Sequence, residues 1–280
     1  CLVGSEMCIR DRLNDTLFDN VDINEYAVGT NGQIIGTPLY LASEKGHLDV
    51  VKELIAHRAD INKGTDVGVT PLSAASLNGH VKVVNELLDN KASVDQADNK
   101  DGSTPLHLAS WYDYVDIVRA LVEEGADVNI KDGYGDTPLH IASSEGFLDV
   151  VKALFQGGAN INQRNNEGDT PLSRAAHAGR VEVVKYLMEM GADINLADND
   201  NARPIDIAAE EKHINVVNLL IPKMTEEEFS QCEKNSEGKV ECGILYSELN
   251  REDAVLPEVV QTEEDTCLLY TSDAADDTCC

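Results

Sequence analysis

The strongest constraint in the sequence is a tripeptide, Thr-Pro-Leu, that returns at an almost constant spacing. Copies open at residues 37, 70, 104, 137 and 170, and a degraded copy, Arg-Pro-Ile, opens at residue 203. The offsets between successive copies are 33, 34, 33, 33 and 33 residues. A fixed period of this length indicates a stack of similar units, each of which needs its neighbours to bury its apolar face.

The most regular copy, residues 137–162, shows what each unit contains. It opens with Thr-Pro-Leu-His, is interrupted by Gly146, continues with apolar residues at helical spacing, and turns at Gly158. This period and pattern resemble the ankyrin repeat, a β-hairpin tip followed by two antiparallel helices. The resemblance covers residues 37–222. It implies an all-α fold, an ankyrin-repeat solenoid of stacked helix-turn-helix units with β-hairpin tips, in six repeats that begin near residues 37, 70, 104, 137, 170 and 203.

The motif residues have predicted physical roles. The threonine hydroxyl should cap the first helix, and proline suits the first helical position because no N–H is needed there. Glycines such as Gly46 and Gly146 should end that helix with a positive φ. The resemblance implies that His107 and His140 form structural hydrogen bonds between repeats; metal binding or catalysis is the alternative for these two histidines.

Both ends of the chain read as translated sequencing-adapter DNA rather than protein. Residues 7–11 can be encoded by ATG TGT ATA AGA GAC, whose reverse complement reads, in a shifted frame, like codons for residues 267–271. We therefore leave residues 1–12 and 267–280, with five of the seven cysteines, out of the fold prediction. The alternative is a short flexible terminus at each end.

The segments that flank the repeats differ from each other. Residues 13–36 are expected to form a partial N-terminal repeat ending in a longer hairpin or an irregular loop, because 17–24 resembles the helix end and turn at 121–129. Residues 223–266 are acidic, poor in aromatics and without periodicity, which predicts a largely disordered tail. Its Cys232 and Cys242 are either free thiols or a local disulfide.

The charge balance limits the partners. The chain has 51 acidic and 22 basic side chains, a formal net charge of −29. Such a surface repels phosphate backbones and anionic lipid, so we expect no nucleic acid and no membrane partner, but a protein with a basic or mixed surface. No apolar run reaches the roughly 18 residues of a membrane-spanning helix. We expect a monomer, and the repeats contain no cysteine, which favours a cytoplasmic or nuclear location.

The sequence offers no recognisable chemistry. No cluster of histidine, cysteine and acidic residues has metal-ligand spacing, and there is no phosphate-binding glycine loop, nucleophile elbow or kinase signature. We therefore predict no enzyme activity, no metal and no cofactor.

Binding should use the positions that the fold leaves free. By the resemblance, these are the hairpin tips and the two residues before each helix-ending turn, which together line a concave face. The predicted partner-binding residues are Glu44, Lys45, Leu77, Asn78, Asp101, Trp111, Tyr112, Tyr134, Ser144, Glu145 and His177.

The third repeat departs most from the pattern. It carries Trp111, the only tryptophan of the chain, next to Tyr112, and it has Asp113-Tyr114 where Gly-His is usual in the family. Aspartate adopts positive φ less readily than glycine, so we expect this turn to be reshaped. The register predicts that Trp111 lies on the surface as part of a binding hot spot; the alternative is that it packs as partial core.

Three functional hypotheses follow. The first is a non-catalytic interaction scaffold that binds a partner protein through the concave groove and hairpin tips. The second is the recognition arm of a larger enzyme or channel. The third makes the chain a substrate, because Asn62, Asn129, Asn162 and Asn195 resemble the hairpin asparagine that is hydroxylated in this family, with Asn129 the best match; the alternative is that each asparagine only stabilises its turn.

Overall fold

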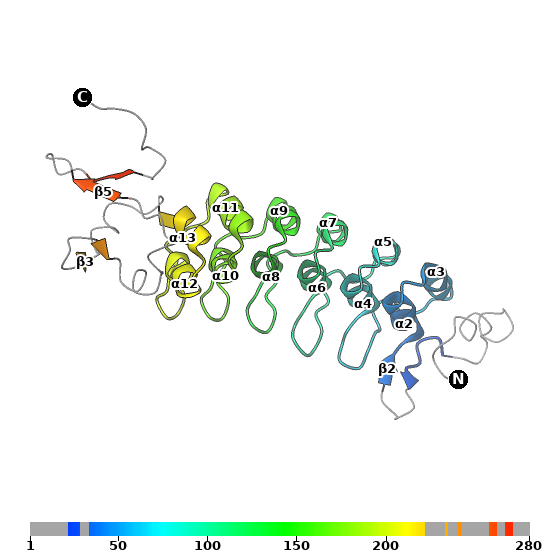
Figure 1. The fold of residues 1–280 in the computed structure, drawn as a ribbon. Coiled ribbons are helices and arrows are strands. Elements are labelled where there is room, and N and C mark those ends of the chain that lie inside the picture. Colours follow the sequence, from blue (N-terminus) through cyan, green and yellow to red (C-terminus); the bar gives the residue numbers. More distant parts are fainter. Residues whose placement is uncertain are drawn as a thin grey trace.

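The computed structural model describes residues 22–28 and 34–221, together with the backbone of four short strands between 233 and 270. In these ranges, twelve helices stack as six antiparallel pairs into an elongated solenoid (Figure 1). The pairs are α2 (Pro38–Glu44) with α3 (Leu48–Ala56), α4 (Pro71–Leu77) with α5 (Val81–Asp89), α6 (Pro105–Trp111) with α7 (Val115–Glu123), α8 (Pro138–Glu145) with α9 (Leu148–Gln156), α10 (Pro171–His177) with α11 (Val181–Glu189), and α12 (Pro204–Glu210) with α13 (Ile214–Leu220). The predicted all-α solenoid is confirmed.

The core lies between two layers of helices. The first helices of the pairs form the layer from which the hairpin loops extend, and the second helices form the other layer (Figure 1). At one register of the first helix every repeat has a completely buried alanine, which lets adjacent first helices approach closely; these are Ala42, Ala75, Ala109, Ala142, Ala175 and Ala208. Val50, Ile55 and Leu108 are only partly buried, because their positions lie at the edge of the buried stripe.

The predicted helix caps are confirmed. Thr37, Thr70 and Thr170 each accept a hydrogen bond from the backbone N–H three residues on, and proline follows in every pair. In the last repeat, where arginine replaces threonine, the Asp206 carboxylate accepts from the backbone N–H of Arg203 at 3.1 Å and pairs with its guanidinium. The degraded repeat thus keeps a cap of different chemistry.

The turn at Asp113 is not reshaped, contrary to the sequence expectation. Asp113 has φ +59°, close to the values of +67° to +85° found at Gly46, Gly79, Gly146 and Gly179, and Lys212 has φ +61° at the same register of the last repeat. The geometry of the stack fixes the left-handed turn, and these two side chains adopt it despite its steric cost.

The hairpin tips form a ladder of backbone hydrogen bonds. The N–H groups of Asn99, Gly133, Asn166 and Asn199 each donate to a carbonyl of the preceding tip, at 2.8–3.2 Å. In the four tips that follow α5, α7, α9 and α11, the Asp or Asn at the start accepts several backbone N–H bonds, and Asp98 accepts three in the tip that holds the one-residue insertion. In the tip between α3 and α4, Thr65 takes this position and accepts one, from Val69.

The two flanks of the repeats contain short antiparallel strands. β1 (Ala27–Val28) pairs with β2 (Ile34–Gly36), which matches the hairpin alternative for this segment. Beyond the repeats, β3 (Glu233–Lys234) pairs with β4 (Val240–Glu241), and β5 (Glu258–Gln261) with β6 (Cys267–Tyr270). These four segments lie in the stretch for which we expected a disordered tail and an adapter sequence. β5 and β6 each contain a pair of apolar residues of the kind found in strands. Residues 1–21, Cys232, Cys242 and the rest of the tail lie outside the described residues.

Candidate functional site

Most of the predicted partner-binding residues lie in one row at the C-terminal ends of the first helices. Lys45, Asn78 and His177 are exposed, whereas Glu44, Leu77, Ser144 and Glu145 are partly buried. Several already have partners within the chain: Lys45 pairs with Glu44 at 3.0 Å, and His177 pairs with Glu211 at 3.7 Å. Most of the row therefore consists of charged and uncharged polar side chains, and its centre differs.

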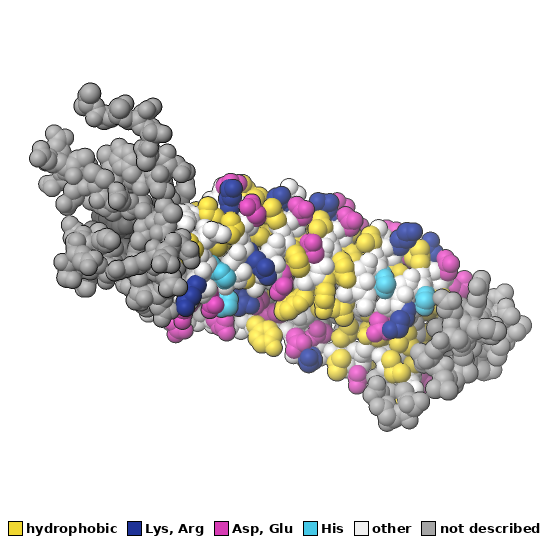
Figure 2. Space-filling view, in the orientation of Figure 1, with side chains coloured by type: hydrophobic (Ala, Val, Ile, Leu, Met, Phe, Trp, Pro, Cys, Tyr) yellow, Lys and Arg dark blue, Asp and Glu magenta, His cyan; other side chains and the backbone are white. Residues whose placement is uncertain are grey.

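The centre of the row is aromatic. Trp111 is 51% exposed and Tyr112 is 50% exposed, as the register predicted. The Tyr112 ring stacks on the Tyr114 ring, with centroids 6.0 Å apart and an interplanar angle of 22°. We call Trp111, Tyr112 and Tyr114 the aromatic surface. Figure 2 shows hydrophobic side chains gathered over the middle of the solenoid, where Figure 1 places α6, with charged side chains around them.

Tyr114 fills a position that holds histidine or arginine in four of the other five repeats. At the same register, His80, Arg180 and His213 each donate a side-chain hydrogen bond at 2.8–3.0 Å. The acceptor is a backbone carbonyl at the end of the first helix of the preceding repeat. Tyr114 keeps the packing of that position, because a β-carbon added to Gly79 would lie 2.8 Å from its ring. The next repeat also has an aromatic, Phe147, at this register. In the third and fourth repeats, next to Trp111 and Tyr112, an aromatic side chain thus replaces the hydrogen-bonding side chain found at this register in other repeats.

The hairpin residues predicted for the site lie elsewhere. Tyr134, at the tip between α7 and α8, is 68% exposed, and Asp101 is partly buried in the preceding tip, where its carbonyl accepts the N–H of Gly133 at 2.8 Å. Trp111 ends α6, whereas the tips precede the N-terminal ends of the first helices. The structure therefore places Tyr134 apart from the aromatic surface, at the other end of the first helices.

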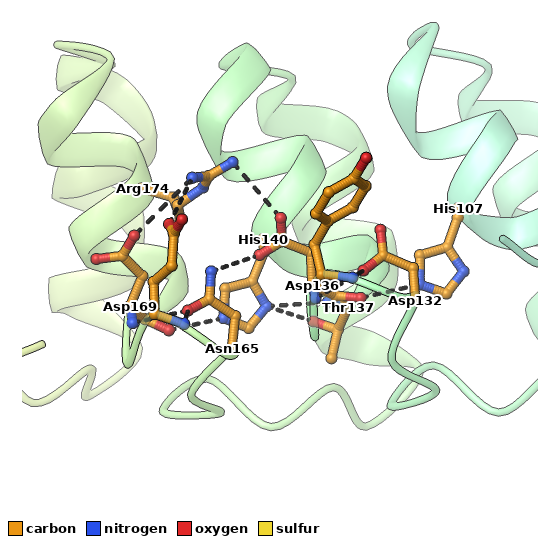
Figure 3. A network of polar contacts seen from close by, with 10 residues as sticks. His107, Asp132, Asp136, Thr137, His140, Asn165, Asp169 and Arg174 are labelled. Atoms are coloured by element: carbon orange, nitrogen blue, oxygen red, sulfur yellow. Dashed lines mark hydrogen bonds and ion pairs between the residues drawn. The ribbon is translucent and has the colours of Figure 1, made fainter. Parts of the chain in front are cut away.

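A polar network joins the fourth and fifth repeats (Figure 3). Arg174 replaces the aliphatic residues found at its register and faces three carboxylates: Asp136 at 3.5 Å, Glu167 at 3.9 Å and Asp169 at 3.9 Å. Asp136 is also held by the Asn165 amide at 2.7 Å. Burial raises the pKa of Asp169, a rise that Arg174 opposes and Asp198 increases. Sequence reasoning missed this network; an arginine at an otherwise aliphatic position was the available signal.

The two motif histidines have the predicted structural role. Nδ1 of His140 accepts from the Thr137 N–H at 3.1 Å, and Nε2 donates to the Asp169 carbonyl of the next hairpin at 3.0 Å. His107 repeats this arrangement with Thr104 and Asp136. Since an N–H only donates and a carbonyl only accepts, both rings are neutral with the proton on Nε2. Burial lowers the pKa of His140 to about 4, although attraction to Asp136 opposes the change.

The hairpin asparagines also bridge repeats. Asn129 is exposed, and its Oδ1 accepts the backbone N–H of Asn160 at 2.8 Å. This bond supports the structural alternative for Asn129, while its modification stays a prediction. Among the described residues, no group of three or more histidine, cysteine or acidic side chains is arranged to hold a metal ion. The described helices include none that is long and apolar enough to cross a membrane.

Comparison with known proteins decides the family. A family model described as ankyrin repeats (3 copies) matches residues 14–98, 39–132, 95–165 and 139–232. The chain belongs to the ankyrin-repeat family. It is 31% identical over 119 residues to alpha-latroinsectotoxin-Lt1a and 33% identical over 95 residues to alpha-latrocrustotoxin-Lt1a, both of Latrodectus tredecimguttatus. The matches cover 40% and 34% of this ankyrin-repeat chain, but only 6% and 4% of the two toxins.

Proposed function

We propose that this ankyrin-repeat protein is a non-catalytic scaffold that binds a partner protein through the aromatic surface and the neighbouring row of helix ends. Ankyrin repeats are protein-interaction modules, which supports the general class. The observation that carries the specific site is the half exposure of Trp111 and Tyr112 on a helix end whose repeat register needs no aromatic residue. Exposed tryptophan and tyrosine dominate the energetics of many interfaces.

The charge supports a basic or mixed partner. The chain carries a formal net charge of −29, and the row beside the aromatic surface contains Glu44, Glu145, Glu210 and Glu211. A positively charged surface would be attracted over a distance of about 8–10 Å at physiological salt. The tips around Tyr134 and Asp101 offer a second contact region for the same partner.

Affinity purification from cells of the source organism tests this function. Wild type, the double variant Trp111→Ala/Tyr112→Ala and the control Met190→Ala should be compared at equal amounts. Met190 is a suitable control because it is exposed and apolar but directly follows α11, a second helix. We expect a set of proteins that wild type and the control retain and the double variant loses. Identical retention by all three would contradict the proposed site.

The length of the matched toxins favours a second candidate, the recognition arm of a larger enzyme or channel. This chain covers only 6% and 4% of those proteins. Sequencing the full-length transcript tests the candidate: a catalytic or membrane-spanning segment joined to these repeats would support it, and a transcript that encodes repeats alone would contradict it.

A further inference from the structure

The aromatic surface borders a hollow that combines tyrosine with carboxylates. The hollow, of about 380 Å³, lies between the turn after α6 and the start of α9. Its lining includes Asp113, Tyr114, Asp116, Arg119 and Asp149. Tyr114 lines the hollow and stacks on the exposed Tyr112, so the aromatic surface and the hollow are adjacent.

Three acids line the hollow, and among the described residues two of them pair with a basic side chain whereas Asp113 does not. Arg119 pairs with Asp116 at 3.8 Å, and Lys152 pairs with Asp149 at 3.3 Å. In the described part of the chain no basic side chain pairs with Asp113. Burial raises the pKa of Asp113, and the nearby Asp149 carboxylate adds to this rise. Asp113 is itself exposed, so its carboxylate is accessible to a cation from a partner.

A carboxylate next to aromatic rings is best matched by a guanidinium group. Arginine stacks on aromatic rings and donates two parallel hydrogen bonds to a carboxylate, whereas lysine offers a strongly hydrated point charge. Trp111 immediately precedes Tyr112 in the chain and is exposed, which suits it to contact an apolar neighbour of the arginine in the same segment. Arg119 also lines the hollow, but it pairs with Asp116 at 3.8 Å and not with Asp113.

We propose that the aromatic surface and Asp113 bind an arginine side chain from an extended partner segment, with its guanidinium against the tyrosines and Asp113 and an adjacent apolar side chain on Trp111. This inference rests on the proposed function and specifies the chemistry of the partner at that site. It also gives Asp113 a role that glycine, the residue most compatible with its φ of +59°, would lack.

The sixth repeat supplies a matched control for this position. Lys212 has φ +61° in the equivalent turn, far along the solenoid from Asp113. Asp113→Gly and Lys212→Gly should therefore both relieve backbone strain and leave the melting temperature unchanged or higher. Only Asp113→Gly should weaken binding, so a loss of binding is separated from a loss of folding.

A display library of random 12-residue peptides, panned on the full chain, tests the inference. The enriched peptides should contain arginine next to a bulky apolar residue. Synthetic copies, labelled and titrated by fluorescence anisotropy, should bind at least ten-fold more weakly to Asp113→Gly and to Trp111→Ala than to wild type and Lys212→Gly. Replacing the peptide arginine by glutamine should cause a similar loss.

The outcomes separate this inference from the function on which it rests. Peptides that need Trp111 but bind Asp113→Gly as tightly as wild type would overturn the arginine site and leave the aromatic interface standing. Enrichment of acidic or uncharged peptides would also overturn the arginine site. Binding that depends on neither residue, or no enrichment above the level of Trp111→Ala/Tyr112→Ala, would overturn both proposals.

Discussion

Oδ1 of Asn129 accepts a 2.8 Å hydrogen bond from the backbone N–H of Asn160, which lies in the next hairpin. The same bond recurs along the stack. Asn24 accepts from Asp60, Asn62 from Ser93, and Asn162 from Asp193, at 2.7–2.9 Å. Each asparagine thus joins two repeats with one side chain, and Asn24 shows that the segment before the first complete helix pair continues the series.

Asp95 takes the place of asparagine in this series and should weaken the stack. It accepts the N–H of Asp127 at 3.1 Å. Burial raises its pKa from 3.8, and the carboxylate of Asp127 adds to the rise although the N–H bond opposes it. Asp95→Asn keeps the acceptor and removes the repulsion, so we expect a gain of about 0.5 kcal/mol in the free energy of unfolding at pH 7.

The sign of the pH dependence provides a check on Asp95. A carboxyl whose folded pKa is raised loses stability as pH rises from 3.8 through the folded pKa, so the advantage of Asp95→Asn should appear over that range and vanish below pH 3.8. Asn162→Asp, which would place a carboxylate against Asp193, is the reverse control and should destabilise the protein at pH 7. Urea denaturation measures both; a destabilised Asp95→Asn would contradict this interpretation.

His140 should make the stack sensitive to acid. Its folded pKa is lowered from 6.5 to about 4, so its contribution is complete above pH 6.5 and is lost as pH falls toward 4. The fold offers serine as a replacement, because Ser173 occupies the equivalent position of the next repeat, where its hydroxyl is hydrogen-bonded to that of Thr170 at 3.1 Å. At pH 8 we expect His140→Ser to lower the free energy of unfolding by about 2 kcal/mol, through a lost hydrogen bond and a cavity.

The difference between wild type and His140→Ser should shrink between pH 6.5 and pH 4. The groups around the ring are Asp136, which favours protonation, and Arg174, which opposes it. Thermal denaturation of both proteins over this range measures the change. A difference that stays constant from pH 8 to pH 4 would mean that His140 does not titrate as described.

Arg174→Leu should destabilise the fourth and fifth repeats, even though leucine or isoleucine fits that register. Removal of the guanidinium leaves Asp136 and Asp169, both nearly buried, without their cation. Because the side chain of Arg174 is 32% exposed, solvent screens part of the effect, and we expect a loss of about 1–3 kcal/mol at pH 7. Asp136→Asn in the Arg174→Leu background should recover part of this loss in urea denaturation. Additive effects of the two substitutions would contradict the coupling.

The regular features could be predicted from sequence because each follows from one local rule. Threonine caps, prolines, left-handed glycines and the His107 and His140 bonds depend on residues a few positions apart or on the repeat itself. The Asp113 turn was predicted wrongly, because neighbouring repeats impose its backbone despite the preference of aspartate. Arg174 was missed, since its three carboxylates come together only when the hairpins stack. The Tyr112–Tyr114 stack likewise depends on side-chain geometry that the pattern does not specify.

The central claim is that Trp111 and Tyr112 bind a partner rather than support the fold. The most direct measurement is the dissociation constant of a captured partner with Trp111→Ala, taken together with the melting temperature of the variant. We predict binding weakened by about 2 kcal/mol or more with the melting temperature nearly unchanged, and wild-type values for both in the Met190→Ala control. Unchanged affinity, or a large fall in melting temperature for Trp111→Ala, would contradict the account.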